Sequence, residues 1–105
     1  MNVKKFIPCI YLYRMHAVAG LTDLTVVETD PVRLAKNYSE NSADALIVFD
    51  MSNGDEEHAR ALDIIREICA EINTEVYGAG NIERMEDVKK ILYAGCTKVI
   101  LNYGK

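Results

Sequence analysis

Residues 74–102, TEVYGAGNIERMEDVKKILYAGCTKVILN, contain every part of a parallel βα unit in order. A short β-prone segment at 74–77 leads into residues 78–81, Gly-Ala-Gly-Asn, where a sharp bend needs residues that tolerate positive φ. Residues 98–101 are mostly apolar, which is typical of a strand buried in a parallel sheet. Between these two β-prone segments, apolar residues recur with the spacing of a helix: Met85, Val88, Ile91 and Leu92. The pattern ends before Gly95, a residue type that often terminates helices. Two parallel strands require such a crossover.

The first half of the chain follows the same plan. Residues 6–13 predict a first strand, and residues 14–29 a long connection that contains a small hairpin with Gly20 at its turn. Asp30-Pro31 begins a helix, with Asp as N-cap and Pro at the first helical position. That helix is expected to end near Ser42.

The middle of the chain supplies a further strand and helix. Residues 45–49, ALIVF, form the most hydrophobic strand, and Asp50 stands at its C-terminal end. Residues 55–57 place acidic side chains in the first turn of a helix, complementing its dipole, and Asn73 closes that helix. The sequence therefore predicts an α/β fold with four parallel strands and three helices, (βα)₃β.

Composition bounds the class of protein. The 105 residues carry a formal net charge of −4 and an isoelectric point near 5.1, which argues against nucleic acid or an anionic membrane as the main partner. No apolar run suits a signal peptide or membrane span, so we expect a cytoplasmic protein. Cys9, Cys69 and Cys96 have no CxxC spacing and are expected to be reduced core residues.

Ligands of parallel α/β folds bind at the C-terminal ends of the strands. A glycine-containing loop before a helix suits phosphate, although a plain tight turn explains the same residues. His16 and His58 have no partner at metal-ligand spacing, so we expect no metal and no cofactor, with His58 facing solvent. The resulting ligand-binding candidates are Asp50, Gly78, Ala79, Gly80, Asn81 and Asn102, beside Tyr11 and Tyr13 of the first strand.

Several motifs together resemble a known family. They are IPCI at 7–10, Ala19-Gly20, the segment 30–50, GAGNI at 78–82 and the segment 85–102. In this order they are similar to the N-terminal half of the histidine-biosynthesis barrels, the cyclase subunit of imidazole glycerol phosphate synthase and the ProFAR isomerase. The resemblance implies half of a (βα)₈ barrel with phosphate sites, which adds Gly20 to the ligand-binding candidates.

Departures from the family pattern concern its chemistry. The position of the family's catalytic aspartate carries Tyr11, and a phenol cannot replace a carboxylate as acid or base near neutral pH. Asn81 and Glu83 replace a glycine and an arginine of the phosphate loop, and Tyr103 replaces a small hydroxyl residue. The family's second catalytic aspartate belongs to a fifth strand. The resemblance therefore implies a degenerate half-barrel with no catalytic residue of its own.

We expect residues 1–105 to be one half-barrel domain, a fragment or one half of a larger barrel. The leading function is a catalytically inactive module for assembly or weak phosphosugar binding, paired as a homodimer or with another half-barrel. Its predicted open edges are 6–13 and 98–101, and its barrel-facing residues are drawn from Ile10, Leu12, Ile47, Phe49 and Ile100. The alternatives are a residual cyclase or isomerase completed by a second half, and a flavodoxin-like, doubly wound binding module with strand order 2-1-3-4.

Overall fold

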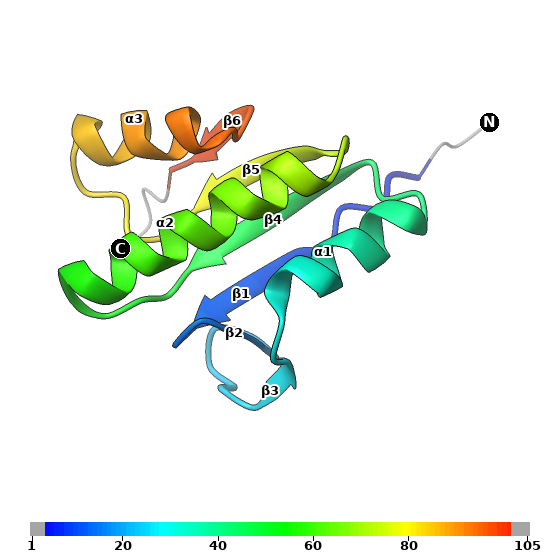
Figure 1. Ribbon diagram of the computed structural model, residues 1–105, viewed down its shortest axis with the longest axis horizontal. Helices are drawn as coiled ribbons and strands as arrows, with labels where there is room; N and C mark the ends of the chain where they lie inside the picture. Colours follow the sequence, from blue (N-terminus) through cyan, green and yellow to red (C-terminus); the bar gives the residue numbers. More distant parts are fainter. Residues whose placement is uncertain (1–3, 102–105) are drawn as a thin grey trace.

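Four parallel strands lie side by side in sequence order in the sheet of this protein, for which a computed structural model describes residues 4–101. The order is β3-β2-β1-β4-β5-β6, and β1, β4, β5 and β6 run parallel. This order confirms the half-barrel prediction and excludes the doubly wound alternative (Figure 1). The strands are β1 (Cys9–Tyr13), β2 (His16–Val18), β3 (Val26–Glu28), β4 (Ala45–Asp50), β5 (Glu75–Ala79) and β6 (Lys98–Ile100).

Each pair of neighbouring parallel strands is joined through a helix. The helices are α1 (Pro31–Glu40), α2 (Gly54–Glu71) and α3 (Met85–Ala94), and all three lie on the same side of the sheet (Figure 1). Asp30 confirms its predicted role as N-cap of α1, since its side chain accepts hydrogen bonds from the amides of Val32 and Arg33. None of the helices in the described part of the chain is long and apolar enough to cross a membrane.

The two faces of the sheet differ in burial. Alternate residues of the parallel strands are buried under the helices, and they form the core with Ile65, Ile68 and Ile91: Ile10, Leu12, Leu46, Val48 and Val76. The intervening residues lie on the opposite face, here called the open face. Ala45 and Ala79 are buried there, whereas the larger apolar and aromatic residues of this face are half-buried or exposed: Tyr11, Ile47, Phe49, Tyr77 and Ile100.

The prediction that Ile10 and Leu12 face the barrel interior is therefore wrong. Their side chains are only 1% and 2% exposed and belong to the helix-covered core, whereas Ile47, Phe49 and Ile100 lie on the open face as predicted. Successive residues of a strand point to opposite faces, so a shift of one residue exchanges the two sets. The first strand is apolar on both faces, and its pattern therefore does not reveal which set is inward.

An antiparallel extension covers one edge of the parallel sheet. Strand β2 pairs with β1 from Tyr11 to Tyr13, and β3 pairs with β2, so the predicted hairpin between residues 14 and 29 is confirmed. Gly20 lies in its turn, where its amide donates to the carbonyl of Asp23 at 3.0 Å. The predicted open edge at 6–13 is wrong for its C-terminal half, because the sheet ends at β3 and β6 instead.

Gly78 allows α3 to pack directly on β5. A Cβ atom at Gly78 would overlap Cγ2 of Ile91 and would lie 3.4 Å from the sulfur of Cys96. Both neighbours belong to the buried core, so neither has room to move away. This contact gives Gly78 a packing role.

We therefore expect Gly78→Ala to lower the free energy of unfolding by about 1–3 kcal/mol, because overpacking a well-filled core forces backbone or rotamer shifts. Urea unfolding followed by circular dichroism measures the change. Gly20→Ala is the matched control, since a Cβ there would meet nothing within 4 Å. Equal stability of the two variants would show that the contact with Ile91 relaxes without cost.

Candidate functional site

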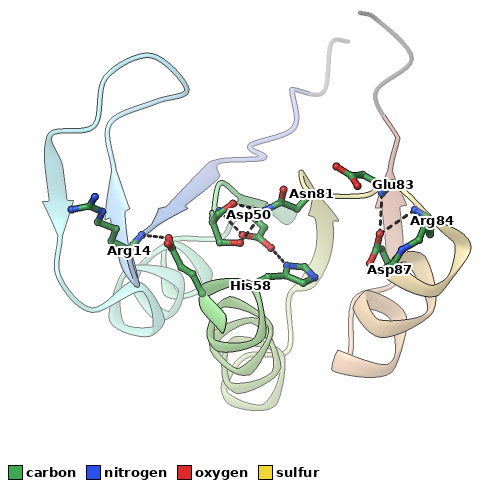
Figure 2. A network of polar contacts seen from close by, with 9 residues as sticks. Arg14, Asp50, His58, Asn81, Glu83, Arg84 and Asp87 are labelled. Atoms are coloured by element: carbon green, nitrogen blue, oxygen red, sulfur yellow. Dashed lines mark hydrogen bonds and ion pairs between the residues drawn. The ribbon is translucent and has the colours of Figure 1, made fainter. Parts of the chain in front are cut away.

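Polar side chains gather where β4 and β5 end and α2 and α3 begin. Asp50 is the last residue of β4, His58 lies in the second turn of α2, and Asn81 and Asp87 follow β5. Figure 2 shows these side chains around a common space between the two helices. Parallel strands and the helices between them bring these groups together, because every strand of this kind ends at the same edge of the sheet.

Asp50 is a buried carboxylate with both oxygens occupied. The residue is 3% exposed; its Oδ1 accepts from the amide of Ser52 at 2.9 Å, and its Oδ2 lies 2.6 Å from Nδ1 of His58 (Figure 2). A carboxylate accepts hydrogen bonds, which assigns the donor role to Nδ1. Asp50 thus fixes the imidazole orientation, and the expectation that His58 faces solvent is wrong.

The other ring nitrogen of His58 is buried without a partner in the described part of the chain, beside a small cavity that the residue helps to line. Nε2 is buried and has no hydrogen-bond partner among residues 4–101. His58 lines a cavity of about 180 Å³ together with Ser52, Gly54, Asp55, Asn81, Glu83, Arg84 and Asp87. A larger hollow of about 580 Å³ between α2 and α3 shares His58. A buried nitrogen without a partner is a position where a ligand group or water gains a hydrogen bond.

The loop after β5 is tied to the loop after β4. Asn81, with φ of 51°, donates from Nδ2 to the carbonyl oxygen of Ser52 at 2.8 Å and to its Oγ at 2.9 Å. Gly80 has φ of 82°, and a Cβ there would overlap the carbonyl oxygen of Asp50 and lie 2.9 Å from Cδ1 of Phe49. Both residues thus hold the loop against β4, a role that serves packing first.

Asp87 occupies the N-terminus of α3. Its Oδ2 accepts hydrogen bonds from the amides of Glu83 and Arg84, each at 3.0 Å, and its side chain is nearly buried (Figure 2). The bond from the Glu83 amide is the main reason that the pKa of Asp87 lies below its ordinary value, with the Arg84 amide and charge adding to it. Both amides belong to the two residues just before the helix, which begins at Met85.

Tyr11 lies on the open face, away from this network. Its ring centroid is 6.1 Å from that of Phe49. A hydrogen bond with Cys9 raises the pKa of the Tyr11 hydroxyl, so the phenol stays neutral at neutral pH. A neutral phenol at this position provides no carboxylate for acid–base chemistry.

The structure therefore joins only some of the predicted candidates. Asp50, Gly80 and Asn81 come together, whereas Gly78 and Ala79 are buried in the sheet and Gly20 lies in the hairpin turn on the far side of β1. Asn102 and Tyr103 lie outside the described residues. No three His, Cys, Asp or Glu side chains of residues 4–101 are arranged to hold a metal ion.

Sequence reasoning missed the roles of His58 and Asp87. His58 stands eight residues after Asp50, across a loop, and nothing in that spacing indicates contact. Asp87 carried a usable signal, because an acidic residue at the third position of a helix reaches back to the amides before it.

Sequentially ordered parallel strands, helices on one face and polar groups at the strand ends define a half-barrel of the (βα)₈ class. Residues 5–104 match the model of the family described as "Histidine biosynthesis protein". The chain belongs to this family.

Among curated relatives, the chain is 34% identical to the imidazole glycerol phosphate synthase subunit HisF of Anoxybacillus flavithermus over 103 residues. It is 33% identical to the subunit of that name from Flavobacterium psychrophilum and 34% identical to that of Geobacillus kaustophilus. Each match covers 97% of this chain and 41% of the relative. The chain thus spans less than half the length of these relatives.

Removing the Asp87 carboxylate tests its role as a cap. We expect Asp87→Ala to lower the free energy of unfolding by about 0.5–2 kcal/mol at neutral pH, since two helix-terminal amides lose their acceptor. Because folding lowers the pKa of Asp87, its stabilisation is complete above the unfolded value of about 3.9. That stabilisation is lost as the pH falls through the lower folded value.

Urea titrations from pH 7 to pH 2 measure this difference, which should shrink toward acid. Glu86→Ala is the matched control, because it removes an exposed charge from the same turn, 4.0 Å from Arg84. A difference between Asp87→Ala and the unchanged chain that stays constant down to pH 2 would contradict a role for the charged carboxylate.

Proposed function

We propose that this chain is a catalytically inactive half-barrel that completes its barrel by pairing with a second half-barrel, in the simplest case a second copy of itself. The observation that carries the proposal is the open face, which bears apolar and aromatic side chains that no helix of residues 4–101 covers. On this proposal residues 1–105 act as one half-barrel domain in the cytoplasm.

Burial of the open face supplies the driving force. Ile100 is 40% exposed, and Tyr11, Ile47, Phe49 and Tyr77 are only half-buried. Covering a few hundred Å² of such surface stabilises a complex by several kcal/mol at about 25 cal/mol per Å². Dissociation constants in the micromolar range correspond to about 8 kcal/mol of net binding free energy, so burial and the pairing of sheet edges must together exceed the entropic cost of association.

The covered edge of β1 restricts how two halves meet. Strand β6 ends the sheet and offers its edge, whereas β2 already pairs with β1 from Tyr11 onward. Cys9 and Ile10, the first two residues of β1, are not paired with β2. On this proposal, β6 of one half-barrel pairs with these two residues of the other half-barrel. A two-fold axis repeats the contact and closes eight parallel strands, with the β2–β3 hairpin outside the ring.

The lack of catalysis in this proposal rests on Tyr11 and on the charges near α3. Tyr11 stands at the family's acid position and stays neutral. The Asp87 carboxylate already accepts from the amides of Glu83 and Arg84, just before α3, and Glu83 adds a second negative charge. These two charges repel an anionic ligand at the start of α3, so phosphosugar binding is weak.

An alternative function is a residual cyclase or isomerase on a phosphoribosyl intermediate of histidine biosynthesis, completed by another half-barrel. Asp50 favours it, because a buried carboxylate that orients a histidine with a free Nε2 is a common catalytic arrangement. Turnover of such a substrate by this chain mixed with the C-terminal half of a HisF relative would select this alternative.

Light scattering tests the assembly. We expect a dimer at micromolar concentration and above, and we expect Ile100→Lys to make it monomeric by placing a charge on the open face next to the β6 edge. Leu92→Lys on α3 is the matched control, since Leu92 is 43% exposed on the helical side. A monomer at high concentration, with β6 amides protected from hydrogen exchange, would contradict the proposal.

Calorimetric titration with ribose 5-phosphate tests the phosphate site. We expect millimolar binding at best, and no turnover of cyclase or isomerase substrates by the chain alone. Asn81→Gly with Glu83→Arg should strengthen binding, because a negative charge becomes positive; Asn81→Gly alone is the control for losing the bond to Ser52. Micromolar binding by the unchanged chain would show that the loop is a working phosphate site.

A further inference from the structure

Two cysteines from different elements meet on the helical side of the sheet. Cys69 lies near the end of α2 and is half-buried, while Cys96 follows α3 and is 5% exposed. The two thiols influence each other: the neighbouring Cys96 thiol lowers the pKa of Cys69, and the Cys69 thiol, together with burial, raises the pKa of Cys96. The third cysteine, Cys9, lies on β1 at the open face, so the described chain holds one close pair and one separate thiol.

The backbone beside Cys96 approaches Cys69 closely. Gly95 ends α3 with φ of 121°, and a Cβ built on it would lie 2.7 Å from Cβ and 3.2 Å from the sulfur of Cys69. Cys96 is the next residue along the chain, and its Cα therefore lies about 3.8 Å from the Cα of Gly95. A disulfide needs the two Cα atoms to lie about 4.4–6.8 Å apart, and the close approach of Gly95 to Cys69 brings the neighbouring Cys96 toward that range.

We propose that Cys69 and Cys96 form an intramolecular disulfide when the protein meets a peroxide-class oxidant, and that this bond staples α2 to the turn that leads into β6. The pair is a site of reversible oxidative modification. For this pair the proposal departs from the expectation that all three cysteines are reduced core residues, an expectation with which the free thiols of the structure agree.

The two thiols are suited to different steps. The hydrogen bond from the Cys96 thiol lowers the pKa of the Cys69 thiol, and the same bond, with burial, raises the pKa of Cys96. Cys69 is also the more accessible of the two. Nucleophilic attack on an oxidant requires a thiolate that the oxidant can reach, so Cys69 reacts first and Cys96 resolves the intermediate.

The chemistry balances with hydrogen peroxide. The Cys69 thiolate attacks one peroxide oxygen, the O–O bond breaks, and a sulfenic acid and hydroxide form; the hydroxide takes the proton that Cys69 released. The Cys96 sulfur then attacks the Cys69 sulfur, the S–S bond forms, and the S–O bond breaks. The Cys96 proton leaves with the hydroxyl group as water. Two thiols are oxidised by two electrons, and peroxide is reduced to two waters.

The bond would act on the strand that ends the sheet. Cys96 stands two residues before Lys98, where β6 begins, and α3 is the only helix between the two cysteines. A disulfide to α2 therefore fixes the start of β6 to a helix that is packed on the centre of the sheet. Opening of β6 from the sheet becomes rarer in the oxidised protein, because the cross-link restricts the open states.

The test uses the full chain with stoichiometric hydrogen peroxide. Remaining thiols are blocked with iodoacetamide in denaturant, and the protein is digested without reductant and analysed by mass spectrometry. We expect the loss of two hydrogens, a fall from three free thiols to one, and a linked pair of peptides that contain Cys69 and Cys96. Cys9→Ser, the matched control, keeps the linkage, and Cys69→Ser abolishes it.

Two results would overturn the inference. One is a peroxide-treated wild-type chain that links Cys9 to another cysteine or keeps all three thiols free. The untreated and the dithiothreitol-reduced chain serve as references with three free thiols. The other is hydrogen exchange at β6 that is equally fast in the oxidised and reduced protein. Peptide mapping of the unchanged chain does not depend on whether any variant folds.

Discussion

The hand of the crossovers between neighbouring parallel strands determines this structure. A strand, helix and parallel strand connect almost always in the right-handed sense. When the strands follow one another in sequence order, as β1, β4, β5 and β6 do, every helix must then fall on the same face. One layer of three helices therefore covers one face of the sheet, and none of the described helices covers the other face. Both the core and the open face follow from this single constraint.

The polar network at the strand ends depends on the same arrangement. Helices α2 and α3 begin next to each other above the ends of β4 and β5, so Asp50, His58 and Asp87 share one region without being near in sequence. Two buried carboxylates in this region are fully occupied within the chain itself. Asp50 orients a histidine and a turn, and Asp87 caps a helix. In a region with the position of a ligand site, both buried carboxylates therefore hold the protein's own loops and helix ends.

Local signals in the sequence predict most of the elements. Asp30-Pro31 places the start of α1, and Gly95 places the end of α3, because caps and left-handed residues act within one turn of the chain. The inward set of β1 was not predictable, since both of its faces are apolar. The turn from β1 to β2 was also hidden: Arg14 and Met15 both adopt positive φ there, and neither residue type favours it. Contacts such as His58 with Asp50 depend on where a helix settles on a sheet, which residue spacing does not encode.

The strand register also bears on how the fold can form. Pairing β1 with β4 brings together Cys9 and Ile47, pairing β4 with β5 brings together Ala45 and Glu75, and pairing β5 with β6 brings together Tyr77 and Lys98. Loop-closure entropy grows only with the logarithm of loop length, so these three closures differ by no more than about 0.5 kcal/mol. Loop-closure entropy therefore favours none of the three strand pairs as the first to form. The order in which they form then depends on the intrinsic stability of the helix in each connection. Among the three, α2 is the longest, at 18 residues, and helix formation becomes more favourable with length.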